Sequence, residues 1–393
     1  MKLRIAEVAP LWYKHPPKMY GGTERVVYNL TEGLVKAGHD VTFFASGDSK
    51  TSAKLVSVYP RSLTEDGIAW TNIMYPLLNM TEAIENEKEF DIIHLHLNIY
   101  SDYIALPLVR HLKNKAIFTV HFPGQNSYSS EGSKEVLQKY SDCNFISISN
   151  AQRIGFPDLN WIGTVHNGID LTRLKFHSQP KDYFVWLGKF KPEKGTKEAI
   201  LAAKKAGVKL VIGGAIDTME PIYFEYYQKE VKPLIDNEQI IYIGEVNEEQ
   251  KNELLGNATG FLNPIQWNEP FGLVMAESLA TGTPVISYRN GSAPEVIADG
   301  KTGYLVDSFE DMVERMKDVE KLQRKDCRRR AVEFFSSESM SENYSSVFED
   351  LLNKNETTSS SFTLDKQPAD MNIEQYYHQQ IYMKHSLKNK MKV

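Results

Sequence analysis

The chain has 393 residues, of which 41% are hydrophobic and 24% charged, and this composition is typical of a globular protein long enough for two domains. A formal net charge of −6 gives no electrostatic reason to expect nucleic acid as a partner. The two cysteines, Cys143 and Cys327, are too few for a disulfide framework or a four-ligand zinc site, which fits a reducing compartment.

The N-terminal segment begins with charged residues but does not continue as a signal peptide. Glu7 and Pro10 interrupt its apolar run. No later segment approaches the roughly 18 consecutive apolar residues that a membrane-spanning helix needs. We therefore expect a cytoplasmic protein without a membrane span.

The first half of the chain alternates short β-rich runs with helical patterns. The runs are apolar on both faces, as in a parallel sheet that helices cover. They span residues 3–9, 41–46, 91–96, 116–121 and 144–149. Between the first two runs, apolar residues recur at helical spacing, and we expect a helix with Thr23 as its N-cap and Gly38 at its C-terminal end.

The second half repeats this organisation. Its β-rich runs span residues 183–189, 209–214, 240–245, 260–265, 284–289 and 303–307. Strands that alternate with helices twice over predict two doubly wound α/β domains. A polar segment at 175–182 separates the two series, so we expect an N-terminal domain at 1–178 and a C-terminal domain at 179–340.

The pattern changes near residue 340. Residues 341–354 have the spacing of one more amphipathic helix, whereas the extension 355–393 starts polar and rich in Ser and Thr and ends in the basic sequence MKHSLKNKMKV. Two interpretations of the extension stay open. It is either a solvated tail, or an accessory segment that contacts an anionic membrane surface or a partner subunit, as in a homo-oligomer.

A basic loop follows the first strand of the second half. The sequence LGKFKPEKG (187–195) carries Lys189 and Lys194 five positions apart across Pro192, so both ammonium groups could reach one ligand at the carboxyl end of the strand. A solvated basic loop is the alternative interpretation of this segment alone.

The sequence NEPFGLVMAES (268–278) places two glutamates eight positions apart around a Pro-Phe-Gly turn. Because a residue before proline is pushed out of helical conformation, Glu269 is expected in the loop and Glu277 inside a helix that starts near Gly272. The backbone N–H groups of Phe271, Gly272, Leu273 and Val274 would then form an anion site at the helix N-terminus.

Two features of the first half are ambiguous when each is taken alone. Gly21 and Gly22 stand between the first strand and its helix, where they allow either close approach of a ligand or a tight turn. His121 ends a strand, where a histidine is either a structural hydrogen-bonding residue or a catalytic one. The chain contains no Asp-x-Asp pair to hold a divalent cation on a diphosphate, so we expect no metal and no cofactor.

Taken together and in order, these motifs resemble the retaining glycosyltransferases of family 4. The resemblance covers roughly residues 1–354, and the segment Glu269 to Glu277 matches the E-x7-E element of that family. It implies the GT-B fold, in which two facing Rossmann-like domains enclose the active site in the cleft between them. The opening residues 8–30 look most like a branch that includes UDP-glucose:tetrahydrobiopterin glucosyltransferases.

The resemblance also implies roles for individual residues. Glu277 would bind the ribose of the nucleotide and Glu269 the donor sugar, while Gly272, Leu273 and Val274 offer backbone groups to the phosphates. Lys189 and Lys194 match the basic diphosphate pair of the family, although its first position is more often Arg, which could bind a phosphate with two hydrogen bonds.

Further assignments follow from the same comparison. His121 would touch the donor sugar or the acceptor hydroxyl, and Gly21 and Gly22 fall in the glycine loop of the family. The expected partners are a nucleotide sugar, with UDP-glucose favoured, and an acceptor that the sequence does not identify.

Two rival functions share this fold. A nucleotide-sugar epimerase would not be expected to carry the E-x7-E sequence element. A non-catalytic scaffold would be expected to have lost the paired charges, yet Lys189, Lys194, Glu269 and Glu277 are all present. We therefore expect a metal-independent hexosyltransferase.

Overall fold

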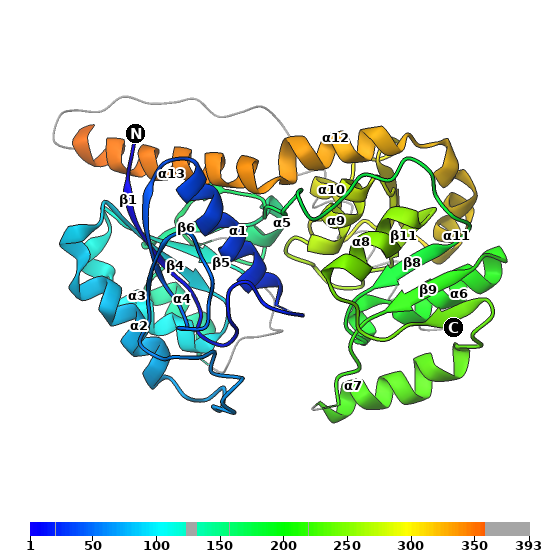
Figure 1. Cartoon of the computed structure of the whole chain (residues 1–393), viewed down its shortest axis with the longest axis horizontal. Helices are drawn as coiled ribbons and strands as arrows, with labels where there is room; N and C mark the ends of the chain where they lie inside the picture. Colours follow the sequence, from blue (N-terminus) through cyan, green and yellow to red (C-terminus); the bar gives the residue numbers. More distant parts are fainter. Residues whose placement is uncertain (20, 123–131, 157, 219, 358–393) are drawn as a thin grey trace. The chain divides into compact units, whose positions relative to one another are not determined.

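The computed structural model describes residues 1–357 apart from 20, 123–131, 157 and 219 (Figure 1). The described chain forms two parallel β-sheets, one in each half of the sequence, and helices cover both faces of each sheet. We call these the first and the second α/β domain. The sequence-based prediction of a doubly wound α/β architecture is confirmed.

The first domain is built on a seven-stranded sheet in the order β3-β2-β1-β4-β5-β6-β7, and every neighbouring pair is parallel. Its strands are β1 (Arg4–Val8), β2 (Asp40–Phe44), β3 (Lys54–Val56), β4 (Ile92–Leu97), β5 (Ala116–Val120), β6 (Asn144–Ser147) and β7 (Trp161–Thr164). The chain adds strands outward from β1 in one direction and then continues from β4 in the other. The order therefore reverses between β1 and β4.

The helices of the first domain are α1 (Gly22–Lys36), α2 (Met74–Glu85), α3 (Ala105–Leu108), α4 (Ser133–Lys139) and α5 (Asn150–Arg153), with 3₁₀ turns at Glu87–Glu89, Tyr100–Ile104 and Arg110–Leu112. One face of the sheet packs against α2, α3 and α4, where Met80, Leu106 and Leu137 join a buried cluster with Val8 and Leu95. Helix α1 packs on the opposite face. Because both faces are covered, most of the strand residues are apolar.

The second domain is built on a six-stranded parallel sheet in the order β10-β9-β8-β11-β12-β13. Its strands are β8 (Phe184–Leu187), β9 (Leu210–Gly213), β10 (Ile240–Tyr242), β11 (Gly260–Asn263), β12 (Val285–Tyr288) and β13 (Gly303–Val306). The order reverses here between β8 and β11, as it does between β1 and β4 in the first domain.

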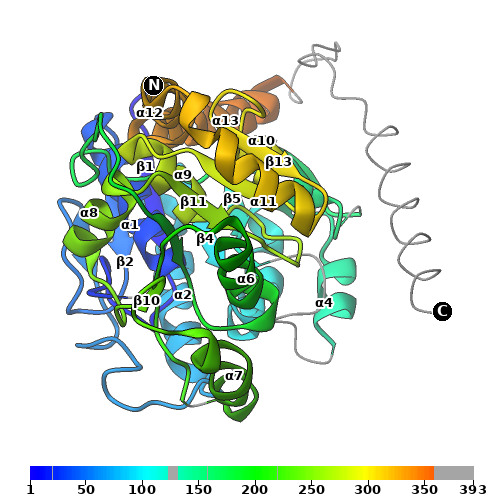
Figure 2. The same ribbon diagram turned by 90° about the vertical axis from the view of Figure 1, so that its right-hand side faces the viewer.

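The second half contains helices α6 (Thr196–Ala206), α7 (Pro221–Tyr226), α8 (Glu248–Asn257), α9 (Leu273–Thr281), α10 (Ala293–Val296), α11 (Phe309–Asp318), α12 (Arg324–Phe335) and α13 (Ser337–Thr357). A π-helical turn at Tyr227–Val231 follows α7, and 3₁₀ turns lie at Pro192–Lys194, Lys232–Leu234 and Val319–Lys321. Helices α6 and α11 lie together on one face of the sheet (Figure 2), and α9 and α12 pack on the other.

Most predicted elements are found near their predicted positions, but two edge strands and one helix N-cap differ from the prediction. The edge strands β3 (Lys54–Val56) and β7 (Trp161–Thr164) were not predicted. Helix α1 starts at Gly22 with Gly21 as its N-cap, so the prediction of Thr23 as N-cap is wrong; the Thr23 hydroxyl instead donates a hydrogen bond to Asn98 at 2.9 Å. Gly38 does follow the helix end, with a φ of 94°.

The described helices include none long and apolar enough to cross a membrane. The extension 355–393, including its basic end, lies outside the described residues except for the last turn of α13.

Helix α13 belongs to the core of the first domain although it comes last in the sequence. Tyr344, Phe348 and Leu351 are buried in one cluster with Leu3 and Ile5 of the N-terminal segment. The helix begins at Ser337, four residues before the predicted 341–354. We propose that α13 braces the first domain and is required for its stability.

We predict that Phe348→Ala lowers the free energy of unfolding by about 3–5 kcal/mol, because it removes a fully buried ring and leaves a cavity. Chemical denaturation measures the change. Asn343→Ala, at an exposed position of the same helix, is the matched control and should be nearly neutral. Equal stability of the two variants would contradict the bracing role.

Candidate active site

The predicted site residues Lys189, Lys194, Glu269 and Phe271–Val274 lie in or beside two loops where the order of the second sheet reverses. The loop 188–195 follows β8, and the loop 264–272 follows β11. Since β8 and β11 are neighbouring parallel strands, both loops leave the same edge of the sheet. The chain turns away in opposite directions after the two strands, and this is the position at which open α/β sheets usually bind ligands.

Glu269 is held at this edge of the sheet by two donors. The ammonium group of Lys194 contacts Glu269 Oε2, and the indole N–H of Trp267 donates to the same oxygen at 3.0 Å. The ammonium group also lies 4.8 Å from the centre of the Trp267 ring. Glu269 and Lys194, chosen from the sequence 75 positions apart, therefore form one unit with Trp267.

Three lysines concentrate positive charge in the loop after β8. Burial lowers the pKa of Lys189, and the charges of Lys191 and Lys194 lower it further. Lys191 is buried, with its ammonium group 4.1 Å from the centre of the Tyr223 ring. Gathering like charges is unfavourable by itself, so this loop is suited to an anionic ligand that would relieve the repulsion.

The turn before α9 has the expected form. Helix α9 starts at Leu273, and its N-cap is Gly272 with a φ of 75°, a conformation that favours glycine. The first N–H groups of a helix have no carbonyl one turn earlier to bind, so this turn is compatible with the expected anion site, which remains a prediction. Phe271 lies in the core, and its carbonyl accepts a hydrogen bond from the Ser292 hydroxyl at 2.7 Å, which fixes the turn.

Glu277 lies inside α9 and is only 4% exposed. It forms an ion pair with Lys251 of α8, which also contacts Glu248 at 2.9 Å. Burial opposes the charge on Lys251, but the two carboxylates outweigh it and raise its pKa. Arg25 of α1 contacts Glu248 at 3.3 Å, so a row of alternating charges runs from Glu277 to α1.

The same charged residues line a pocket. It is formed by parts of α1, α8 and α9 and by the segment 168–174. Glu277 and Leu273 belong to its wall, together with Arg25, Glu248 and Asp170. The assignment of Glu277 to a ribose remains a prediction, but its carboxylate does lie beside a cavity.

The glycine loop lies at the start of α1. Gly21 has a φ of 142°, and a side chain there would collide with Pro17, so this position requires glycine. A methyl group on Gly22 would lie 3.4 Å from Leu273, which brings the glycine loop against the start of α9. The backbone of Gly22 therefore lies close to the side chain of Leu273.

Glu24 is a buried carboxyl group at the same helix start, and the sequence did not single it out. It is 3% exposed, and burial raises its pKa to about 7. The charge of Asp102 raises the pKa further, whereas Arg25 and Lys189 lower it. A protonated carboxyl group near neutral pH offers both a hydrogen-bond donor and an acceptor in this region.

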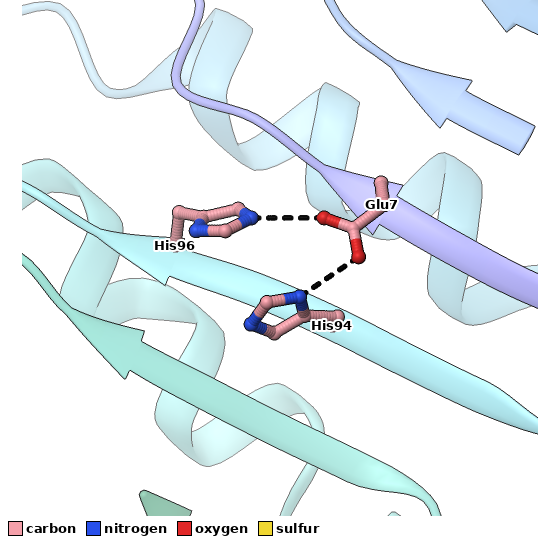
Figure 3. A group of neighbouring side chains, drawn as sticks. All are labelled: Glu7, His94 and His96. Atoms are coloured by element: carbon pink, nitrogen blue, oxygen red, sulfur yellow. Dashed lines mark hydrogen bonds and ion pairs between the residues drawn. The ribbon is translucent and has the colours of Figure 1, made fainter. Parts of the chain in front are cut away.

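His121 follows β5 and is part of a buried polar network. Its Nε2 lies 2.9 Å from Nδ1 of His96, and Nε2 of His96 lies 2.9 Å from one carboxylate oxygen of Glu7. The other oxygen of Glu7 lies 2.8 Å from Nδ1 of His94 (Figure 3). His94 continues the network through its Nε2, which lies 2.7 Å from the Thr119 hydroxyl.

Glu7, His94 and His96 are also close enough together to hold a metal ion, the one such group among the described residues. All three side chains are buried. The distances from the two Glu7 oxygens to the facing nitrogens of His94 and His96 are 2.8 and 2.9 Å, which are hydrogen-bond distances. Each ring nitrogen that faces Glu7 already has a partner. The expectation that the protein needs no metal stays a prediction.

The structure thus joins Lys194 with Glu269 and Gly22 with Leu273, and places His121 in a separate histidine network. Sequence reasoning missed Trp267, Lys251 and the Glu7 network. The sequence does contain one signal for Trp267 and one for the histidines of the Glu7 network. Trp267 stands two positions before Glu269, and His94 and His96 alternate on β4, which puts both on one face of the sheet.

Two family sequence models match the chain. "Glycosyltransferase Family 4" matches residues 20–173, and "Glycosyl transferases group 1" matches residues 172–334. These two matches identify the class of protein as a glycosyltransferase. The matches together run without a gap from residue 20 to 334, so both halves of the chain resemble glycosyltransferase domains and support a glycosyl transfer function.

Curated relatives agree with this class of protein. "Putative glycosyltransferase YtcC" of Bacillus subtilis is 25% identical over 330 residues, which cover 75% of this chain and 77% of the relative. "N-acetyl-alpha-D-glucosaminyl L-malate synthase" of Bacillus anthracis is 26% identical over 374 residues, which cover 84% of this chain and 94% of that protein.

Solved structures confirm the GT-B fold. Sucrose-phosphate synthase of Thermosynechococcus elongatus aligns with a TM-score of 0.71 at 17% identity, covering 90% of this chain and 100% of that one. Anabaena Alr3699/HepE, solved in complex with UDP and glucose, aligns with a TM-score of 0.65 at 14% identity, covering 88% of this chain and 100% of that one.

We predict that Glu24 makes the protein less stable as the pH rises from about 4.5 to about 7. In this window the unfolded chain releases the proton while the folded protein keeps it, so the free energy of unfolding falls. Glu24→Gln cannot ionise and should be about 1–3 kcal/mol more stable than the wild type above this window, but not below it.

Urea denaturation on both sides of the window tests this prediction. Glu85→Gln, at an exposed position of α2, is the control and should leave the pH dependence unchanged. If the wild type and Glu24→Gln show the same pH dependence, the raised pKa is wrong.

Proposed function

We propose that this glycosyltransferase is a retaining, metal-independent enzyme that transfers a hexose from a nucleotide sugar to a hydroxyl group. The observation that carries the proposal is the unit of Lys194, Glu269 and Trp267 at the point where the strand order reverses, beside the N-terminus of α9. This unit combines cations for a diphosphate with a fixed carboxylate for a sugar.

The positive groups serve the leaving diphosphate. Breaking the bond between sugar and phosphate increases the negative charge on the departing oxygen. Lys189, Lys194 and the first-turn N–H groups of α9 stabilise that charge in place, which lowers the barrier without a metal ion. The repulsion among the lysines is relieved when the diphosphate binds, so the loop favours the charged ligand.

Glu269 serves the donor sugar. A carboxylate next to a diphosphate would be repelled, but it accepts hydrogen bonds from sugar hydroxyls. Lys194 and Trp267 both bind Oε2, which fixes the plane of the carboxylate, and we assign Oε1 the contact with the sugar. Glu277 would accept from the ribose hydroxyls, with Lys251 held beside it by Glu248.

Retention of configuration needs no protein nucleophile in this proposal. The acceptor hydroxyl attacks the sugar on the face that the diphosphate leaves, and the departing phosphate oxygen takes the hydroxyl proton. His121 contacts the sugar or the acceptor from the first domain. The acceptor class is a small molecule or a glycan.

We also propose a cytoplasmic location, since Cys143 and Cys327 are both buried free thiols, as is usual in a reducing compartment. UDP-glucose is the first donor to test, because it is the donor of the branch that the N-terminal sequence resembles, and because HepE, with the same fold, was solved with UDP and glucose.

The test is incubation of the purified protein with a panel of nucleotide sugars, with and without candidate acceptors, followed by mass spectrometry. We expect slow hydrolysis of UDP-glucose without acceptor and no effect of EDTA. Loss of activity in EDTA that Mn²⁺ restores would overturn the metal-free mechanism. A changed sugar that is still attached to the nucleotide would indicate an epimerase instead.

We predict that Lys194→Ala lowers turnover at least about tenfold, because it removes a cation that stabilises the leaving group and also releases Glu269. Lys197→Ala is the matched control: it lies three residues away, pairs with Glu230 at 2.6 Å, and should leave turnover within about twofold. Donor hydrolysis rates measure both. Equal rates in the two variants would remove Lys194 from the site.

A further inference from the structure

The hydrogen bonds around Glu7 determine which nitrogen of each histidine carries a proton. Glu7 is fully buried on β1 and accepts from one nitrogen of His94 and one of His96. The two histidines lower the pKa of Glu7 to about 2, although burial alone would raise it. The carboxylate is therefore ionised and can only accept, so Nδ1 of His94 and Nε2 of His96 must both be protonated.

The next step fixes the proton of His121. Burial lowers the pKa of His96 to about 4, so its imidazole is neutral near pH 7 and carries one proton only. That proton is on Nε2, so Nδ1 of His96 is an acceptor. Nε2 of His121 lies 2.9 Å from this acceptor and must donate to it.

His121 is therefore left with an acceptor at its other nitrogen. Burial lowers the pKa of His121 well below its ordinary value, so His121 is also neutral near pH 7. With its one proton on Nε2, Nδ1 has a lone pair. A hydroxyl group can donate to this nitrogen, whereas an unprotonated anion such as a phosphate oxygen cannot.

We propose that Glu7 and His96 are positioning residues that hold His121 as its Nε2–H tautomer, so that Nδ1 accepts a hydrogen bond from a hydroxyl of the donor sugar or of the acceptor. The inference rests on the proposed function for the identity of that hydroxyl. It assigns Glu7 and His96 a role in orienting the hydroxyl-binding group, and it makes His121 a contact for a sugar and not for a phosphate.

The burial of this network favours a permanent arrangement. Glu7 and His94 are fully buried, and His96 is 2% exposed, so water does not compete for their hydrogen bonds. Both oxygens of Glu7 have a histidine partner, and each of those histidines uses its second nitrogen as well. Reversing one tautomer would leave a buried donor facing a donor, which is costly.

The direct test is nuclear magnetic resonance of the full chain labelled with ¹⁵N at histidine. The protein has 10 histidines, few enough for assignment by single substitutions. Two-bond ¹⁵N–¹H correlations distinguish a protonated ring nitrogen from an unprotonated one. We expect His121 to be neutral with its proton on Nε2 near pH 7. A proton on Nδ1, or on both nitrogens, would overturn the proposal.

His96→Phe removes the acceptor and keeps a ring of similar size. We expect His121 in this variant to become a mixture of both tautomers and glycosyl transfer to fall about fivefold or more. Tyr344→Phe is the matched control, since the Tyr344 hydroxyl lies 2.9 Å from that of Thr119, at the opposite end of the network. It should leave the His121 tautomer unchanged, and a change equal to that in His96→Phe would contradict the assigned roles.

Two further outcomes separate this inference from the proposed function. The tautomer of His121 is measured without any donor, so the expected spectrum from a protein that transfers no sugar would refute only the proposed function. Metal analysis of the purified protein tests the alternative in which Glu7, His94 and His96 bind a metal ion. One equivalent of bound zinc that His94→Phe removes would overturn the hydrogen-bonded arrangement.

Discussion

The reversal of strand order in each parallel sheet is the constraint on which the site depends. Where neighbouring strands continue in opposite directions, no helix covers their carboxyl ends, and the loops that leave them meet. In the second domain this brings together Lys194 and Glu269, which are 75 positions apart. The corresponding reversal in the first domain lies between β1 and β4, the strands that carry Glu7 and the paired histidines.

Much of this arrangement could be predicted from the sequence. Runs that are apolar on both faces identified eleven strands, because buried parallel strands leave no polar face to confuse the pattern. The prediction that Pro270 separates Glu269 from the helix carrying Glu277 is confirmed by the start of α9 at Leu273. The edge strands β3 and β7 were not predictable in this way, because both strands are short and none of their residues is fully buried.

The partners of the site residues could not be predicted in the same way. Lys251 pairs with Glu277 only because α8 and α9 pack together, and a surface lysine and a buried one look the same in a sequence. In the sequence alone Glu7 is only an interruption of an apolar run, whereas in the structure it is the centre of a polar network. A lone acidic residue in a buried strand is informative only when its neighbours on the next strand are known.

The position of α13 also has a consequence for biosynthesis. Leu3 and Ile5 leave the ribosome long before Tyr344, Phe348 and Leu351, which pack against them in one buried cluster. The apolar face of the first sheet consequently stays partly open to water while the second domain is being synthesised. Nascent chains that stop after β7 would expose this face to chaperones and proteases, so translation must pass residue 351 before the first domain closes.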